Sequence, residues 1–600
     1  MGHYKSNLRD IEFNLFEVLD LDDYLGKPPF GDVDHDAVLD ALREVERLSR
    51  EDFAASFEEA DRNPPTLRDG EVVLPDAVKK SLDAYFEGGW HLLGAPEELG
   101  GFGAPGLVRW ATQEMLVGAN PAVFFYVSGI LMAVVLGLVG TPEQVERFAK
   151  PMIDRRWGGT MVLTEPDAGS DVGAGTTKAI HVEGETYHLE GIKRFITSGD
   201  HDYAENIVHL VLARREGGEP GTPGLSMFIV PKYLVNEDGS LGERNGVVAT
   251  NVEKKMGIKG SSTCELTFGA GRPAVGYLVG GVHTGIRQMF RVIEDARLLI
   301  GCKSAATLST GYLNALEYAK HRVQSADLTQ MPDKSAPRVE IIRHPDVRRM
   351  LMLLKSHSEG MRALLYYTAW ASDQERMHPE DESFMRHADL LLPLLKGYGS
   401  EKSYELLGQA LQVFGGSGFL QDYPLEQYIR DVKIDSLYEG TTGIQALDLF
   451  FRKIVRDQGE TLRGTTAEVM EIVDDGPEAL QSERLLLGEA VEHAQAHIGV
   501  MVGHAIASQS DAPELYKVGL HANALLETLA EIVIAWLMLR HAAVALRSID
   551  GASASDASFY RGKVESARFF AHHALPKARL RREAAEREDG ALMEMPDAAF

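Results

Sequence analysis

One glutamate of this chain stands where a carboxylate could act as a base. Glu439 lies in the segment Tyr438-Glu439-Gly440-Thr441-Thr442, between two stretches with a helical pattern. Gly440 has no side chain that could crowd the neighbouring carboxylate. Burial away from water raises the pKa of a carboxyl group, which would let it accept a proton from a weakly acidic C–H bond. An isolated Glu-Gly pair is more often a surface turn, so this interpretation depends on the surrounding residues.

A second group of residues could bind a flat ring or a phosphate. The segment 164–171 (TEPDAGSD) follows a β-prone run, and its small residues would present backbone N–H groups and hydroxyls to a ligand. Further along, Phe195 could lie against a flat ring and Thr197 could form a hydrogen bond to it. Each segment alone is more often a structural turn, whereas the two together indicate a cofactor site.

A third group combines an arginine with a glycine-rich segment. The planar guanidinium of Arg322 could form paired, charge-assisted hydrogen bonds to a pyrophosphate. Gln412, Gly415 and Gly416 lie in the segment QVFGGSG. A solvated arginine and a glycine helix cap would explain these residues equally well. Arg297 follows two acidic residues, a pattern that usually marks a surface ion pair.

As an ordered set, these segments closely resemble the acyl-CoA dehydrogenases. The resemblance extends from residues 96–101 (PEELGG) to Arg456. The additional segments at both ends are similar to those of large bacterial members of fatty-acid β-oxidation, especially actinobacterial members with a broad chain-length range. The resemblance implies oxidation of a saturated acyl-CoA to its trans-2-enoyl-CoA with FAD as the cofactor. Glu439 would remove the proton next to the thioester carbonyl, while a hydride passes from the β carbon to FAD.

The resemblance also implies roles for individual residues. The implied FAD contacts are Leu163, Thr164, Gly169, Ser170, Phe195, Thr197, Arg322, Gln412, Gly415, Gly416 and Thr441. The implied substrate contacts are Ser170, Arg297, Tyr438 and Gly440. No metal is implied. Three places depart from the family pattern. Phe195 replaces a common tryptophan, Gly443 replaces a common glutamine, and Val323-Gln324-Ser325 follows Arg322 where many relatives carry an aromatic residue.

Several partners follow from the same resemblance. Arg322, Gln412 and the glycine pair would reach the FAD of a neighbouring subunit, which requires a homo-oligomer; a dimer is favoured and a tetramer is the alternative. Electron-transfer flavoprotein would be the electron acceptor. Two other functions stay open on the same fold: an acyl-CoA oxidase that uses oxygen, and a non-catalytic DNA-associated relative.

Composition narrows the classes of partner and location. The chain has 600 residues, too many for one compact core, and 44% of them are hydrophobic. Its formal net charge of −28 disfavours binding to nucleic acid or anionic lipid. Cys264 and Cys302 are the only cysteines, which excludes a disulfide framework or a Cys-based zinc site. The first twenty residues lack the apolar stretch of a secretion signal, so we expect a cytoplasmic protein, peripheral to the membrane at most.

An uncharged stretch, Pro121 to Gly140, is nearly long enough to cross a bilayer. Ser128, Gly129 and Gly137 interrupt it and no basic cluster flanks it, so we expect a buried helix without stable membrane insertion. Such a helix could also line a pocket for a hydrocarbon chain. The residues that could line or block this pocket are Phe124, Phe125, Tyr126, Leu131 and Met132.

Apolar periodicity predicts an α+β multidomain fold, because helical segments flank a region of strands. The expected strands are Thr160–Leu163, Ala179–Val182, Ile207–Leu212, Leu225–Val230 and Cys264–Phe268. The expected parts are an N-terminal extension (1–35), a helical domain (36–157), a β-barrel or sandwich domain (158–282), a helical bundle with Glu439 (283–457) and an appended helical domain (458–600). The polar residues 457–483 are expected to form a linker.

Overall fold

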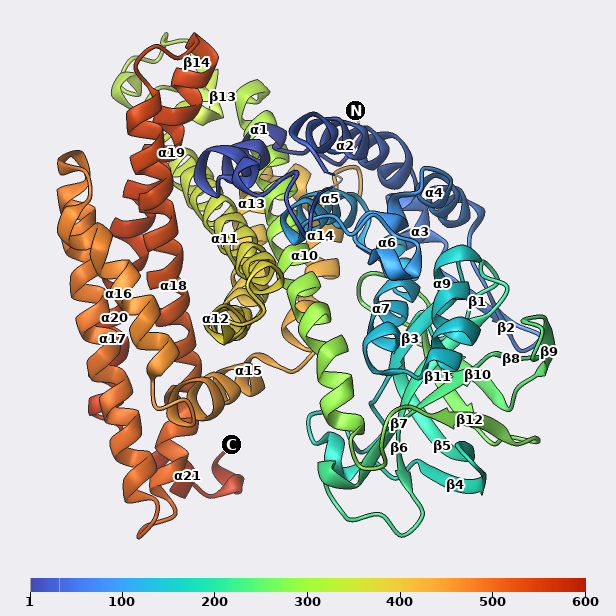
Figure 1. The fold of residues 1–600 in the computed structure, drawn as a ribbon. Coiled ribbons are helices and arrows are strands. Elements are labelled where there is room, and N and C mark those ends of the chain that lie inside the picture. Colours follow the sequence, from blue (N-terminus) through green and yellow to red (C-terminus); the bar gives the residue numbers. More distant parts are fainter. Residues whose placement is uncertain (1, 32) are drawn as a thin grey trace. The chain divides into compact units, whose positions relative to one another are not determined.

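The structure is a computed structural model that describes residues 2–31 and 33–600 (Figure 1). Its internal contacts divide the chain into two compact units. The first contains Tyr24–Leu299 and the residues up to Lys5, and the second contains Ser6–Asp23 and Ile300–Phe600. The long helix α10 (Gly285–His321) contributes the residues up to Leu299 to the first unit and those from Ile300 to the second.

Helices come first in the first unit. They are α2 (His35–Leu48), α3 (Phe57–Arg62), α4 (Asp76–Glu87) and α5 (Gly106–Ala119). The side chain of Asp34 accepts a hydrogen bond from the Ala37 backbone N–H at 2.8 Å and thereby caps α2. One face of α2 is apolar and buried, through Val38, Leu42 and Val45.

The uncharged stretch is buried, as predicted, but it is not one helix. It forms α6 (Pro121–Phe124), a 3-10 turn (Phe125–Val127) and α7 (Gly129–Val139). The chain packs so closely at Gly129 that a Cβ there would overlap the Trp157 carbonyl. Within the described residues, this stretch and α18 (Glu514–Ser548) are apolar enough to cross a membrane, but 61% and 83% of the relevant residues are buried. Both stretches are therefore part of the core.

An eight-stranded sheet follows, in the order β10-β11-β5-β12-β7-β6-β3, with β4 paired to β5 and β6. Its strands are β3 (Gly158–Val162), β4 (Lys178–Glu183), β5 (Thr186–Thr197), β6 (Ile207–Arg215), β7 (Leu225–Pro231), β10 (Val247–Val252), β11 (Thr263–Phe268) and β12 (Ala274–Leu278). Two hairpins, β1–β2 (Thr66–Arg68, Glu71–Val73) and β8–β9 (Tyr233–Val235, Leu241–Arg244), lie outside it. All five expected strands are present, whereas β5, β10 and β12 were not expected.

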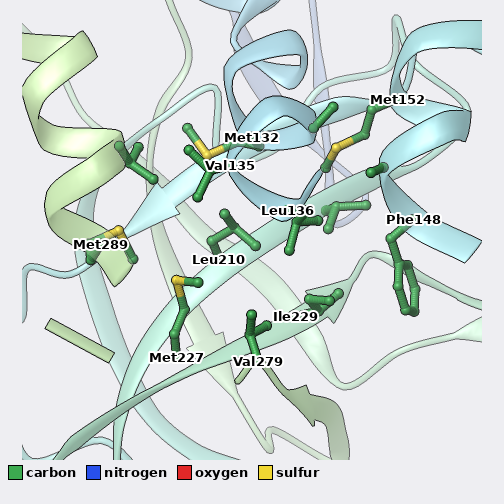
Figure 2. Close-up of a cluster of buried hydrophobic side chains, with 14 of the residues drawn as sticks. Met132, Val135, Leu136, Phe148, Met152, Leu210, Met227, Ile229, Val279 and Met289 are labelled. Atoms are coloured by element: carbon green, nitrogen blue, oxygen red, sulfur yellow. The ribbon is translucent and has the colours of Figure 1, made fainter. Parts of the chain in front are cut away.

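Both faces of the sheet are covered. Alternate residues of β6 enter different clusters, with Leu210 on one face and Val211 on the other. Figure 2 shows the first cluster, where Met132 and Leu136 of α7 meet Leu210 and Met227 of the sheet. The sheet is thus a rigid layer, and the ends of its strands can hold side chains in fixed positions.

The second unit contains a helical bundle. Its helices after α10 are α11 (Pro345–Met377), α12 (Glu382–Pro393), α13 (Gly399–Phe414), α14 (Leu425–Val432) and α15 (Thr442–Asp448). A π-helical segment, Leu394–Tyr398, joins α12 to α13. A hairpin of β13 (Val323–Ala326) and β14 (Arg338–Glu340) follows α10.

More helices complete this unit, with α18 as the long apolar one. The others are α16 (Glu460–Asp475), α17 (Gln481–Ala507), α19 (Ala554–Ala574), α20 (Lys577–Glu586) and α21 (Ala591–Glu594). The expected linker at 457–483 is wrong, because most of it forms α16. Only Thr465 and Val469 of α16 are buried, one turn apart, so its sequence is almost as polar as a linker.

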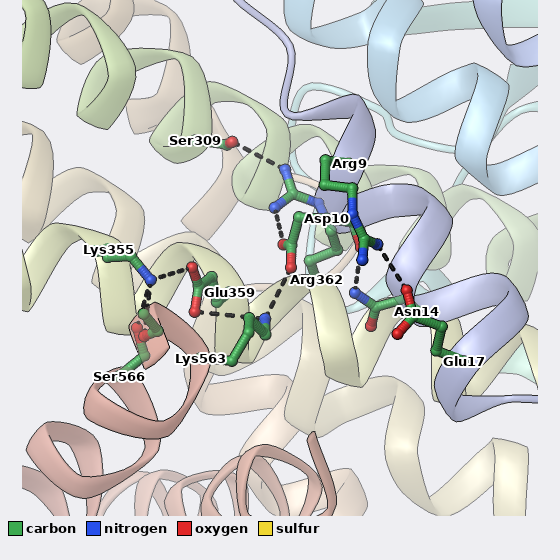
Figure 3. Close-up of polar contacts among 11 residues, drawn as sticks. Arg9, Asp10, Asn14, Glu17, Ser309, Lys355, Glu359, Arg362, Lys563 and Ser566 are labelled. Carbon is green, nitrogen blue, oxygen red and sulfur yellow. Dashed lines mark hydrogen bonds and ion pairs between the residues drawn. The ribbon is translucent and has the colours of Figure 1, made fainter. Parts of the chain in front are cut away.

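Charged side chains attach the N-terminal segment to this unit (Figure 3). Asp10 of α1 (Leu8–Glu12) is fully buried and accepts hydrogen bonds from Arg362 of α11 and Lys563 of α19, each at 2.7 Å. Lys563 also lies 3.3 Å from Glu359. Burial opposes ionisation of Asp10, but the two cations outweigh burial and hold the pKa of Asp10 well below its ordinary value.

Candidate functional site

Glu439 lies on a tight turn between two helical segments, as predicted. A short 3-10 helix ends at Ser436, and α15 begins at Thr442 with Thr441 at its N-cap. Glu439 and Gly440 both have left-handed backbones, with φ of +57° and +89°. The left-handed conformation costs a non-glycine residue about 1–3 kcal/mol, so surrounding contacts must maintain it at Glu439. The Glu439 side chain is half-buried.

Two buried side chains form hydrogen bonds to the backbone of this turn. Gln445 Nε2 donates to the Glu439 carbonyl oxygen at 2.9 Å. Lys396 Nζ donates to the Gly440 carbonyl oxygen at 2.5 Å. Lys396 and Gln445 are both fully buried. Two consecutive carbonyls are therefore fixed by donors from the π-helical segment and from α15.

A buried carboxylate, Asp435, supports Tyr438, the residue before Glu439. Asp435 accepts hydrogen bonds from Lys303 Nζ at 2.5 Å, Ser304 Oγ at 3.0 Å and Tyr438 Oη at 3.0 Å. Burial raises the pKa of Asp435, although these donors act in the opposite direction. Burial and the neighbouring Asp435 carboxylate raise the pKa of Tyr438 well above its usual value. Tyr438 therefore stays a neutral hydrogen-bond donor at neutral pH.

In the first unit, a buried ion pair shapes the segment that follows β3. Glu165 lies 2.9 Å from Lys193 Nζ and accepts hydrogen bonds from the Thr176 and Thr177 backbone N–H groups at 2.6 and 3.0 Å. Burial opposes ionisation, but Lys193 and the hydrogen bonds lower the pKa of Glu165 to about 2. Lys193 also donates to the Leu163 carbonyl at 2.7 Å.

The same segment presents small groups to solvent. The Arg194 backbone N–H donates to the Thr164 carbonyl at 2.9 Å, which joins the end of β3 to β5. Gly169 and Ser170 are exposed at the turn beyond. The structure thus holds Leu163 and Thr164 in place and leaves the Gly-Ser corner accessible, as a ligand site requires.

Phe195 projects from a β-bulge. The register between β11 and β5 pairs Cys264 with Ile196 and Leu266 with Lys193, so β5 has one additional residue there. Phe195 has φ of +61°, and 56% of its surface is exposed. The guanidinium of Arg194 lies 4.9 Å from the centre of the Phe195 ring. Thr197, two residues along the strand, is half-buried. The bulge turns a large aromatic ring outward, where it can pack against a flat ligand.

The third group is brought together in the second unit. Tyr318, near the end of α10, stacks on Phe414 with ring centres 4.3 Å apart, and its hydroxyl donates to Ser417 Oγ at 3.3 Å. These contacts place the end of α10 beside the glycine segment. Arg322, Gln412, Gly415 and Gly416 are all exposed. All four lie outside the segment 438–442 that carries Glu439.

A cavity of about 90 Å³ lies in the first unit. Phe124, Phe125 and Leu131, three of the residues expected to line or block a pocket, line this cavity. Tyr126 and Met132 are not among its lining residues, since the Tyr126 hydroxyl donates to the Gly260 carbonyl at 2.9 Å and Met132 packs in the core.

The cavity has a polar side as well. Arg109 of α5 and Asp295 of α10 form an ion pair in its wall, and Arg297 is not part of the lining. His91 also lines it, and burial, together with Arg156, lowers the pKa of His91 to about 4. His91 is therefore neutral at neutral pH, and the cavity wall combines apolar rings with one paired charge.

Several residues of these sites could not be found from the sequence pattern. Four of these side chains form hydrogen bonds or ion pairs with residues that are distant in the chain: Arg109, Lys193, Lys303 and Lys396. The one available signal was a lysine inside the apolar run LLLPLLKGYG at 390–399. Among the described residues, no group of three or more His, Cys, Asp or Glu side chains could hold a metal ion. Cys264 and Cys302 are both buried and are not joined in a disulfide bond.

Three family profiles match successive parts of the chain. The acyl-CoA dehydrogenase middle domain matches residues 160–270 and the acyl-CoA dehydrogenase C-terminal domain matches residues 283–452. A profile described as acetyl-CoA dehydrogenase C-terminal like matches residues 465–596.

Curated relatives match the chain over its full length. The broad-specificity linear acyl-CoA dehydrogenase FadE5 of Mycobacterium tuberculosis is 53% identical, with 100% of both chains covered. A butyryl-CoA dehydrogenase of Syntrophomonas wolfei is 35% identical, also with 100% of both chains covered.

A solved structure shares the fold. The acyl-CoA dehydrogenase of Bacillus anthracis complexed with FAD has a TM-score of 0.72 and 20% identity, covering 94% of this chain and 90% of that chain.

Proposed function

This chain belongs to the acyl-CoA dehydrogenase family, and on that premise we propose that Glu439 is its catalytic base. The enzyme oxidises acyl-CoA to trans-2-enoyl-CoA and uses FAD as its cofactor. When bound, FAD supplies the acceptor for the hydride from the β carbon. The full-length relatives carry dehydrogenase names, so we set aside the oxidase and the DNA-associated alternatives.

One observation carries the assignment of the base. Glu439 is half-buried on a left-handed turn, and Gln445 and Lys396 hold its own carbonyl and the next one. The two bonds hold the backbone of the turn in this strained conformation, so the Glu439 side chain leaves the backbone in a defined direction. Proton removal from a weakly acidic carbon requires a carboxylate that is held near it.

Residues from each unit would contact FAD. In the first unit, the exposed Phe195 ring would pack on the ring system and Thr197 would form a hydrogen bond to it. The accessible corner at Gly169 and Ser170 would approach the cofactor closely, beside Leu163 and Thr164. In the second unit, Thr441 would contribute from the turn that carries Glu439.

We also propose how the substrate binds. The cavity at Phe124, Phe125 and Leu131 would accept the acyl chain, because its apolar wall suits a hydrocarbon. The name of the FadE5 relative supports linear acyl chains of varied length as substrates. Ser170, Arg297, Tyr438 and Gly440 would contact the thioester and the remainder of the acyl-CoA.

The proposed assembly follows from the exposed third group. This group, which consists of Arg322, Gln412, Gly415 and Gly416, would bind the FAD of a second copy. A homodimer is then the smallest complete enzyme. Electron-transfer flavoprotein would reoxidise the flavin. We propose a cytoplasmic location, with peripheral membrane contact at most.

Replacement of the carboxylate tests the base directly. E439Q should retain FAD but lose reduction of the flavin by acyl-CoA by roughly 100- to 10,000-fold, measured anaerobically by stopped-flow absorbance. E380Q, an exposed glutamate of the same unit, is the matched control and should reduce normally. Normal flavin reduction by E439Q would show that another group is the base.

A further inference from the structure

We infer that Lys396 is a positioning residue for the catalytic turn, acting on Glu439 through the Gly440 carbonyl. The inference rests on the proposed role of Glu439. Lys396 does not contact the substrate in this scheme. It fixes the backbone from which the base projects, and it does so from a position that is fully buried.

The position of Lys396 is unusual for a lysine. It lies in the π-helical segment Leu394–Tyr398, where the neighbouring leucines are buried. Lysine is rarely buried unless it is paired, because its ammonium loses hydration. A buried ammonium in this segment therefore requires an explanation beyond packing.

Its contact with the turn supplies one. Lys396 Nζ donates to the Gly440 carbonyl at 2.5 Å, and Gln445 Nε2 donates to the Glu439 carbonyl at 2.9 Å. Together these bonds fix the peptide orientations on both sides of Gly440. They maintain φ of +57° at Glu439, which a glutamate adopts only under constraint.

Loss of the ammonium would leave the Gly440 carbonyl without this donor. The turn could then relax toward ordinary backbone angles, and the carboxylate of Glu439 would change direction. A displacement of about 1 Å in a reacting group can lower a rate by about 100-fold. The rate of the chemical step should fall, whereas the affinity for the acyl chain, which depends on the first unit, should not change.

The experiment compares K396M, K396Q and K396R as FAD-loaded enzymes. K396M should lower the anaerobic rate of flavin reduction by roughly 10- to 100-fold, with unchanged FAD content and an unchanged Kd for acyl-CoA. The rate should rise in the order K396M, K396Q, K396R, because K396Q restores a neutral donor and K396R a charged one. K563M is the matched control, since Lys563 is equally buried in the same unit but pairs with Asp10.

The outcomes separate the two proposals. K563M should lower thermal stability without lowering the reduction rate per bound FAD. Wild-type reduction in K396M, or equal rates in K396Q and K396R if K396M does not fold, would overturn the role of Lys396. If E439Q itself reduces normally, the base assignment fails instead, whatever the lysine variants do.

Discussion

Asp10 and Lys563, 553 residues apart in the chain, form an ion pair with a 2.7 Å separation and essentially no exposure to solvent. Arg362 occupies the other carboxylate oxygen at 2.7 Å. The first helix of the chain is therefore attached to α11 and α19 by charge. Removing one member of a buried pair leaves the others without compensation, which is usually more damaging than losing a surface pair.

We predict that D10N destabilises the second unit by about 3–5 kcal/mol, because Lys563 and Arg362 would both lose a buried counter-charge. Urea unfolding followed by circular dichroism measures this difference. D20N, at an exposed position of the same N-terminal segment, should unfold like the wild type. Equal stability of D10N and D20N would mean that the pair has no net effect on folding.

The contribution of Asp10 should depend on pH in a defined direction. Its folded pKa lies below the ordinary value, so the unfolded chain takes up its proton first as the pH falls. The stabilisation is complete above the unfolded pKa, about 4, and is lost progressively below it. The difference in unfolding free energy between wild type and D10N should thus be constant from pH 6 to 8 and shrink below about pH 4. A difference that instead grows in acid would contradict the ionised state of Asp10.

The broad organisation could be predicted from the sequence, because apolar periodicity is a local property. The five expected strands and the buried stretch at Pro121 followed from it. The strand β5 was missed, since Gly191, Lys193 and Arg194 interrupt its apolar pattern. Only the bulge in that strand explains why Phe195 faces outward, and a bulge depends on the pairing partner.

The candidate site was predictable only where a motif is contiguous. Glu439 and its glycine are adjacent in the sequence, so the turn could be identified. Lys396 is 44 residues from the carbonyl that it holds, and Arg109 is 186 residues from Asp295. Periodicity carries no information about such pairs, because they arise from tertiary packing.

We predict that E165Q weakens FAD binding. Lys193 would keep its bond to the Leu163 carbonyl but lose its buried counter-charge, and the backbone N–H groups of Thr176 and Thr177 would lose one of their two acceptor oxygens. Flavin fluorescence on dilution should show release of FAD about tenfold faster or more, since breaking a buried charged contact costs several kcal/mol. E146Q is the control, because Glu146 pairs with Lys150 on an exposed helix surface of the same unit. Equal release rates in the two variants would show that the Glu165 pair does not support the site.

The dependence of activity on acyl-chain length should change when Leu131, which lines the cavity from α7, is replaced. L131W adds a bulky ring to a space of about 90 Å³, so activity should fall more for long-chain than for short-chain acyl-CoA. We expect kcat/KM to fall at least tenfold for long-chain acyl-CoA and to change little for butyryl-CoA, a discrimination in the range that steric changes in apolar pockets produce. A ladder of acyl-CoA lengths with an artificial electron acceptor measures it. L138W is the matched control, because Leu138 lies on the same helix but is 71% exposed. If both variants show the wild-type dependence of kcat/KM on chain length, the acyl chain does not enter this cavity. If kcat/KM of L131W falls equally for all chain lengths, the ring has disturbed the fold of α7 and has not shortened the pocket. Circular dichroism and FAD content would reveal such a disturbance.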